Sequence, residues 1–235
     1  FIAEKGHVLA AFDYSQIELR FIAHLAGDKP LQQVFIDGRD VHDEVAKKLG
    51  LDRRAAKAIN FGVIYGLSAF GLSQSLKIDQ SVARQYIEAY FATYPRLKDY
   101  LNRTRAEIKE KGYVETLFGR RREIPEIYAA NAVVRAQAER MAINAPAQGT
   151  AADIMKLAMI RSHDWLEKTF GQKIERPYLT LQVHDELLLE CPKDKTKAVA
   201  ARVTSIMEQA ANISAPLVAN AEIGPNWGEM ASFPR

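Results

Sequence analysis

The feature that most constrains this fold is a long apolar run broken by His184-Asp185-Glu186. Leu179–Val183 precedes the tripeptide and Leu187–Leu189 follows it, which predicts two strands joined by a tight hairpin. Tight hairpins usually carry Asn-Gly or Asp-Gly, because those residues accept positive φ. The charged tripeptide is therefore not explained by turn geometry. A carboxylate held near a core needs compensation, and a cation is the natural source of it.

A second carboxylate follows another apolar stretch near the start of the chain. Asp13 ends the run at residues 7–12, far upstream of Asp185. Two strand-end aspartates that are distant in sequence suggest one divalent-metal site assembled by the fold. Taken alone, Asp13 is more simply interpreted as the N-cap of the helix predicted to follow it.

Composition narrows the class of protein less than these positions do. The chain has 235 residues, 26% of them charged, and a net charge of +3, which is ordinary for a globular domain. No apolar run reaches the length of a bilayer span and the first residues lack signal-peptide order, so we expect a cytoplasmic protein without a membrane partner. The one cysteine, Cys191, excludes an internal disulfide framework. Basic clusters at 53–54 and 120–122 favour phosphate as a partner.

The periodicity predicts strands near both ends of the chain and helices between them. Strands are expected at 7–13, 179–190 and about 218–223, and a small hairpin is expected around 119–121. Helices are expected at 15–26, 31–36, 41–49, 53–65, 80–94, 97–111, 133–143, about 150–170, and 195–212. The predicted fold class is α+β, with an antiparallel sheet interrupted by a mainly helical insertion.

One predicted helix carries an unusual stripe. Arg53, Lys57, Phe61 and Tyr65 recur every four residues, so a helix places them on one slowly rotating face. Cations at one end suit a triphosphate and aromatic rings at the other suit a base. The alternative is an amphipathic helix with a solvated first turn. Cations there oppose the helix macrodipole, which argues mildly against that alternative.

These segments together resemble the sequence motifs of the family A DNA polymerases, the bacterial DNA polymerase I group. Asp13–Arg20 resembles motif A, Arg53–Gly66 resembles motif B and His184–Glu186 resembles motif C, in the order that the family has them. Gly112–Arg121 and Arg140–Asp153 also match in character. The resemblance covers essentially the whole chain.

The resemblance implies a right-hand polymerase fold. It places the palm at residues 1–20 and 118–235, and the fingers at 21–117 with the motif B helix at about 53–66. The thumb is expected to be absent from this chain and to come from the full-length protein or another chain. The connection at 50–53 is about ten residues shorter than the family usually has, which is either a true short join or a missing loop.

The resemblance also implies the chemistry. Asp13, Asp185 and the Tyr14 backbone carbonyl would hold two Mg²⁺ ions, with Glu186 as an accessory carboxylate and Lys57 as a candidate proton donor to pyrophosphate. The reaction would be in-line attack of a primer 3′-hydroxyl on the α-phosphate of a dNTP.

Two further sets of contacts are implied by the resemblance. The residues expected to bind the dNTP are Gln16, Glu18, His42, Arg53, Lys57, Phe61 and Tyr65. The residues expected to bind primer–template DNA are Arg120, Arg121, Arg140, Asn144, Gln148 and His184. Glu18 would exclude a ribose 2′-hydroxyl with support from Tyr65, and Phe61 would face the sugar 3′ position. Considered alone, His42 would be interpreted as a surface histidine.

Two other functions compete with DNA synthesis. A single-subunit RNA polymerase of related fold is disfavoured by Glu18 and Phe61, because a ribonucleotide enzyme should not carry a bulky carboxylate gate. A non-catalytic nucleic-acid-binding fragment is disfavoured by the intact Asp13–Asp185 pair. Measuring dNTP against NTP incorporation separates the first from DNA synthesis, and primer extension separates the second.

Overall fold

The structure is a computed structural model that describes residues 1–171 and 176–233. It divides into two compact units, one formed by Phe1–Ile17 with Ala151–Arg235 and the other by Glu18–Thr150. One unit contains an antiparallel sheet and the other is mainly helical, which confirms the predicted α+β class. The predicted palm and fingers boundaries remain predictions, because compact units need not coincide with functional domains.

The sheet of the first unit has the strand order β4-β5-β1-β6-β7, and every neighbouring pair is antiparallel. The strands are β1 (His7–Tyr14), β4 (Tyr178–Val183), β5 (Glu186–Pro192), β6 (Ala219–Gly224) and β7 (Ala231–Ser232). The β4–β5 hairpin was predicted at 179–190. The two-residue strand β7 was not predicted, since two residues carry no periodicity.

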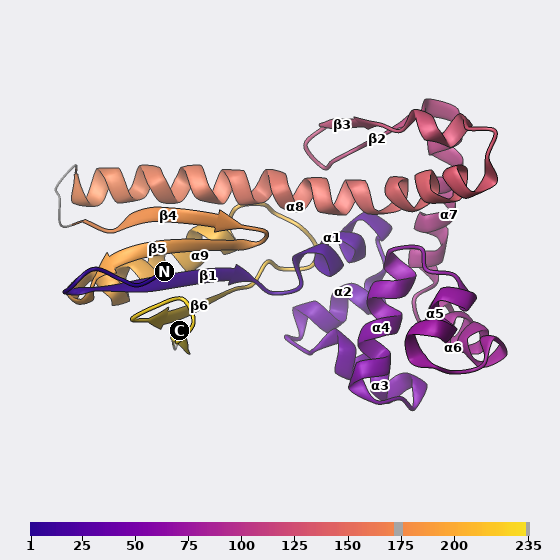
Figure 1. Cartoon of the computed structure of the whole chain (residues 1–235), viewed down its shortest axis with the longest axis horizontal. Helices are drawn as coiled ribbons and strands as arrows, with labels where there is room; N and C mark the ends of the chain where they lie inside the picture. The colour runs from indigo at the N-terminus through magenta and orange to yellow at the C-terminus, as the bar shows by residue number, and fades with distance from the viewer. Residues whose placement is uncertain (172–175, 234–235) are drawn as a thin grey trace. The chain divides into compact units, whose positions relative to one another are not determined.

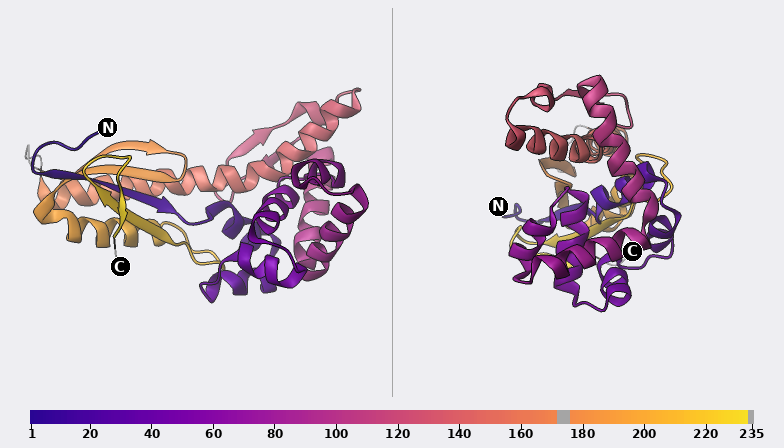
Figure 2. Two further views of the ribbon diagram at one scale, coloured as in Figure 1. Left: turned by 60° about the horizontal axis from the view of Figure 1, so that its bottom comes forward. Right: turned by 90° about the vertical axis from the view of Figure 1, so that its right-hand side faces the viewer.

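The two faces of β1 pack against different partners. Helix α9 (Thr196–Glu208), which follows the short 3₁₀ turn Lys193–Lys195, contacts β1, β5 and β6, and Figures 1 and 2 show it beside these strands. The Tyr14 hydroxyl on that face donates to the Met207 carbonyl at 2.8 Å. Leu9 and Ala11 point the other way and form a small apolar cluster with Leu188. Side chains alternate along a strand, so Asp13 shares the face of Leu9 and Ala11.

The second unit is a set of short capped helices followed by a hairpin. The helices are α1 (Ile17–Ala26), α2 (Lys29–Ile36), α3 (Val41–Leu49), α4 (Arg53–Ile64), α5 (Ala69–Leu76), α6 (Gln80–Thr93) and α7 (Pro95–Lys111). Strands β2 (Tyr113–Glu115) and β3 (Arg121–Glu123) form the hairpin, and the 3₁₀ turn Pro125–Tyr128 follows. Helix α5 was not predicted. Pro95 is the first residue of α7, where its missing N–H costs nothing, rather than only a stop signal for α6.

The short connection between α3 and α4 is closed by two helix caps. Gly50 adopts φ 66°, and the N–H of Leu51 donates to the Ala46 carbonyl at 2.9 Å. Asp52 then accepts from the Ala55 N–H at 2.7 Å. The backbone groups at both helix ends therefore find partners within a three-residue turn.

Helix α8 (Ala132–Phe170) is a single 39-residue helix, about 58 Å long, where two helices were predicted at 133–143 and from about 150. Figures 1 and 2 show it without a break. Pro146 lies inside it and removes one backbone hydrogen bond. The two-helix prediction was wrong because packing outweighs that loss: Ala138, Ala142 and Ala145 belong to one buried cluster, and further residues are buried beyond Pro146.

Among the described residues, no helix is both long and apolar enough to cross a membrane.

Candidate active site

The first part of the site is a group of carboxylates at one end of the sheet. Asp13 lies opposite Glu186 in the β1–β5 register, and Asp185 occupies the hairpin just before Glu186. The Tyr14 N–H donates to the Asp185 carbonyl at 3.1 Å. The Asp13 and Asp185 carboxyl groups share a hydrogen bond. The structure therefore brings the two distant aspartates together within one compact unit.

The crowding of acidic groups changes their protonation. Partial burial, followed by the charges of Asp185, Glu186 and Glu222, raises the pKa of Asp13 to about 7. Burial also raises the pKa of Glu186, against the lowering effect of its hydrogen bond from the Trp227 indole N–H at 2.9 Å. Like charges this close oppose ionisation of one another, and a bound cation relieves that cost.

Two of these neighbours were not found from the sequence. Glu222 enters because β6 pairs with β1 and places it opposite Ala11, on the Asp13 face. Trp227 follows β6 in a loop segment with no periodic signal. The positions of Glu222 and Trp227 near Asp13 cannot be inferred from the local sequence pattern, because both depend on β6 lying beside β1.

The backbone beside the carboxylates is strained at two predicted site residues. Gln16 and His184 both have φ 52°, in the left-handed region that non-glycine residues rarely adopt. His184 is held by its own hairpin, where its carbonyl accepts from the Gln182 amide at 2.7 Å. Such strain concentrates at functional sites.

The donor set fits a hard divalent cation. Asp13, Asp185 and Glu186 offer only carboxylate oxygens, which Mg²⁺ and similar ions prefer. Burial, followed by the charges of the neighbouring carboxylates, raises the Asp13 pKa, and a bound cation would offset both effects.

In the second unit, α4 forms the predicted stripe. Arg53 at its start is paired with Asp40 and Asp43, each at 2.8 Å, and Lys57 is exposed one turn later. The rings of Phe61 and Tyr65 are stacked with centroids 5.9 Å apart. Cations and aromatic rings thus follow one another along one helix face, as the spacing predicted.

His42 lies next to this stripe and is only 3% exposed, so its interpretation as a surface histidine is wrong. Its ring lies 5.5 Å from that of Phe61. The Asn60 amide approaches its Nδ1 at 3.0 Å, while the Asn60 carbonyl oxygen accepts from the Tyr90 hydroxyl at 3.0 Å. The same amide nitrogen lies 3.5 Å from the Val41 carbonyl, which fixes its orientation as a donor.

This arrangement selects one tautomer of His42. Since Asn60 donates to Nδ1, that nitrogen must accept, and the proton of the neutral ring sits on Nε2. Burial lowers the pKa of His42, with Arg53 and Lys57 adding to that effect and Asp40 opposing it. The ring is therefore a neutral Nε2–H donor beside two cations. The sequence analysis did not predict Asn60 and Tyr90 as partners of His42, because a buried polar pair within helices produces no sequence pattern of its own.

The two residues predicted to form the sugar gate are in contact. The Tyr65 hydroxyl donates to the Glu18 carboxylate across 47 residues of sequence. The bond restrains the Glu18 side chain, and its role as a steric gate stays a prediction.

Three predicted DNA contacts share one face of α8. Arg140, Asn144 and Gln148 are spaced by four residues. The Asn144 side-chain oxygen is buried without a hydrogen-bond partner. Gly66, at φ 70°, packs against this helix so closely that a Cβ there would lie 3.3 Å from the Arg140 side chain. The end of α4 therefore meets α8 at the first of the three residues.

The two predicted phosphate contacts of the β2–β3 hairpin are engaged within the protein. The Arg120 guanidinium donates to the Gly149 carbonyl at 3.0 Å. Arg121 pairs with Glu115 at 2.8 Å and lies over the Tyr113 ring at 4.5 Å. Both arginines are exposed.

Clustered strand-end carboxylates that suit divalent metal ions are a feature of phosphoryl-transfer enzymes. The family model described as DNA polymerase family A matches residues 1–229, and the chain belongs to this family.

The chain is 48% identical to DNA polymerase I of Pseudomonas aeruginosa over 238 residues, which cover 97% of this chain and 26% of that protein. It is also 48% identical to the thermostable DNA polymerase I of Thermus aquaticus over 236 residues, covering 97% of this chain and 28% of that one. The chain spans about a quarter of the length of these curated relatives.

A solved structure, the POL domain of Pol1 from M. smegmatis in complex with DNA primer-template and dNTP, has the same fold. The TM-score is 0.90 at 39% identity, and the match covers 97% of this chain and 41% of that one.

Proposed function

We propose that this chain carries the catalytic part of a template-directed DNA polymerase, adding dNMP from dNTP to a primer 3′-hydroxyl. The observation that carries the proposal is the hydrogen-bonded pair Asp13–Asp185 at adjacent strand ends, in a chain of DNA polymerase family A. The solved relative bound to primer-template and dNTP supports the same substrates.

The carboxylates are proposed to hold two Mg²⁺ ions, with the Tyr14 carbonyl as a further ligand. Bound Mg²⁺ supplies activation of the 3′-hydroxyl and neutralisation of the triphosphate and leaving pyrophosphate. Asp13 must lose its proton to bind, and Glu186 stays oriented by Trp227. Gln16, three residues after Asp13, is proposed to contribute to dNTP binding.

The α4 stripe is proposed to bind the triphosphate and the sugar. Arg53 exchanges Asp40 and Asp43 for phosphate, and Lys57 donates a proton to the leaving pyrophosphate. His42 donates from Nε2 to a phosphate oxygen. Charge-assisted hydrogen bonds of this kind are about twice as strong as neutral ones.

Selection of deoxyribose is proposed to rest on Glu18. Held by Tyr65, its carboxylate fills the space that a 2′-hydroxyl requires. Phe61 faces the sugar 3′ position and disfavours dideoxynucleotides.

Primer–template is proposed to bind through two kinds of contact. Arg140, Asn144, Gln148 and His184 contact the newest base pair through minor-groove acceptors, whose positions depend on correct pairing more than on sequence. Arg120 and Arg121 bind backbone phosphate and give salt-dependent affinity. A thumb segment from the full-length protein or another chain supplies further DNA contacts, and the bacterial relatives suggest action in the bacterial cytoplasm.

Primer extension with Mg²⁺ tests the proposal. The parent chain should extend a primer with dNTPs and not with NTPs, and Asp185→Ala should abolish extension. Asp164→Ala, which removes an exposed carboxylate of α8, is the matched control and should extend as the parent does.

Extension by Asp185→Ala at the parent rate would contradict the proposed metal role. If the parent does not extend, Mg²⁺-dependent dNTP binding is measured by fluorescence titration. Binding that is absent from the parent, or equal in parent and Asp185→Ala, would also contradict the proposal and favour a non-catalytic fragment.

A further inference from the structure

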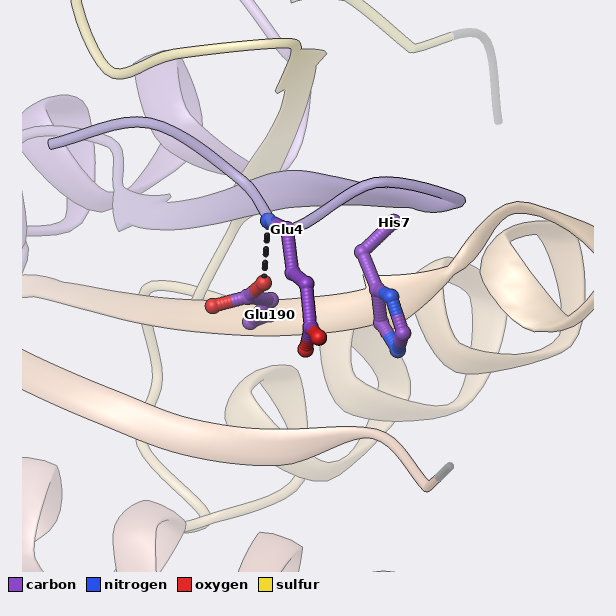
Figure 3. A group of neighbouring side chains, drawn as sticks. All are labelled: Glu4, His7 and Glu190. Atoms are coloured by element: carbon purple, nitrogen blue, oxygen red, sulfur yellow. Dashed lines mark hydrogen bonds between the residues drawn. The ribbon is translucent and has the colours of Figure 1, made fainter. Parts of the chain in front are cut away.

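A second group of potential metal ligands lies at the other end of β1. Glu4, His7 and Glu190 each offer a ligand atom, and these atoms lie within 4.8 Å of one another. Figure 3 shows the side chains of Glu4 and His7 side by side, with the Glu190 carboxylate next to the Glu4 backbone. His7 and Asp13 are six residues apart on one strand, or about 20 Å, so the cluster is separate from the catalytic carboxylates.

The strand register explains why these residues meet. Glu190 on β5 lies opposite Leu9 of β1, and His7 points to the same face two residues earlier. Diagonal neighbours of this kind are within reach of long side chains. The Glu4 N–H donates to the Glu190 carboxylate at 2.7 Å, which fixes the segment before β1 beside the same carboxylate.

The cluster carries negative charge without a matching cation. Glu190 is only 8% exposed, and its second oxygen accepts from the Tyr178 hydroxyl at 2.9 Å. Both of its donors are neutral. Within residues 1–171 and 176–233, no ion pair joins a lysine or arginine to Glu4 or Glu190. Two carboxylates near the start of β1, one of them buried, therefore lack the cationic partner that buried charge normally has.

His7 adds a second, independent indication. Its Nδ1 is buried and has no hydrogen-bond partner, although buried ring nitrogens normally have one. An imidazole beside two carboxylates is a ligand set for a borderline transition metal, because sites for Mg²⁺ or Ca²⁺ use oxygen alone.

We propose that Glu4, His7 and Glu190 bind one Zn²⁺ ion, with water as the fourth ligand. Zn²⁺ takes nitrogen and carboxylate ligands at about 2.0–2.2 Å, so tetrahedral ligands lie about 3.3–3.6 Å apart. The present separation of up to 4.8 Å requires the exposed Glu4 side chain to move inward by about 1 Å, which a rotamer adjustment supplies. The ion joins the segment before β1 to β5 and so stabilises the edge of the unit away from the catalytic end.

Zinc titration of the purified chain tests this site without reference to polymerase activity. Asp185→Asn is introduced throughout and is called the background; it weakens metal binding at the catalytic carboxylates. Zn²⁺ binding is measured by calorimetry. We expect one Zn²⁺ per chain and an affinity at least tenfold lower after His7→Gln. His163→Gln removes an exposed histidine of α8 and should bind as the background does.

Thermal unfolding gives a second readout. At a free Zn²⁺ concentration about a hundredfold above Kd, the melting temperature should rise by about 5–10 °C in the background and in His163→Gln, and by much less in His7→Gln. Glu4→Gln keeps the backbone N–H that donates to Glu190, and it should also lose the rise in melting temperature on Zn²⁺ binding. It therefore serves as the test variant if His7→Gln does not fold.

Equal Zn²⁺ affinity in His7→Gln, Glu4→Gln and the background would overturn the assignment. Absence of binding to the background at millimolar Zn²⁺ would overturn it as well.

Discussion

Replacing Asn60 with alanine should destabilise the helical unit strongly, because its side chain is completely buried between three polar partners. It donates to His42 Nδ1 and approaches the Val41 carbonyl, and it accepts from Tyr90. Asn60→Ala leaves the Tyr90 hydroxyl and His42 Nδ1 buried without partners. A buried polar group left unpaired costs about 1–3 kcal/mol, so the two together cost about 2–6 kcal/mol.

Urea unfolding measures this loss directly. Asn102→Ala is the matched control, since Asn102 lies on an exposed face of α7 and such substitutions stay within about 0.5 kcal/mol. The reasoning is refuted if Asn60→Ala and Asn102→Ala have free energies of unfolding within about 0.5 kcal/mol of each other.

The same residue controls the chemistry of His42. Asn60→Asp keeps the volume and places an acceptor at Nδ1, so the ring should take a proton there and its pKa should rise. In the parent, burial lowers the His42 pKa below 6.5, so the folded state binds fewer protons than the unfolded state just below that pH. This contribution to stability is complete above pH 6.5 and is lost as the pH falls through the folded pKa.

¹⁵N spectra of labelled histidine test the tautomer of His42. They should show the Nε2–H tautomer in the parent and its loss in Asn60→Asp, and an Nδ1–H tautomer in the parent would contradict the assignment.

Three other predictions concern the catalytic chemistry. Because Asp13 has a pKa of about 7, protons compete with the metal, and the apparent Mg²⁺ affinity should rise about tenfold per pH unit below pH 7 and level off above it; a flat profile from pH 5 to 8 would count against Asp13 as a ligand. Phe61→Tyr should increase incorporation of dideoxynucleotides in a terminator assay, and no increase would argue against its place at the sugar 3′ position. Tyr65→Phe removes the hydrogen bond to Glu18 and should lower the preference for dNTP over NTP by up to about tenfold, with unchanged selectivity as the contrary result.

Local physical chemistry makes several elements predictable from sequence. The bounds of α3 were predicted as observed, because Asp40 caps its start and Gly50 ends it in the left-handed conformation. The β4–β5 hairpin was also predicted to within two residues at either end, because two apolar runs flank a short polar turn. Such signals lie within a few residues of the element that they define.

The two predictions that were wrong, for α8 and for His42, failed because packing between distant segments gives no signal in the local sequence. Two helices were predicted at 133–143 and from about 150, but buried contacts on both sides of Pro146 keep α8 continuous. His42 looks like a surface residue because its partner Asn60 is 18 residues away and gives no signal in the local pattern.

The sequence alone determined the family, the fold class and the acidic residues that end two strands, because motif identity and short-range periodicity are local properties. Only the tertiary structure decided which strands lie beside β1, and with them the hydrogen bond between Asp13 and Asp185 and the addition of Glu222 and Trp227 to their surroundings. The same is true of the Glu4–His7–Glu190 cluster. Strand pairing joins residues more than 170 positions apart, and no single segment encodes which strands will lie side by side.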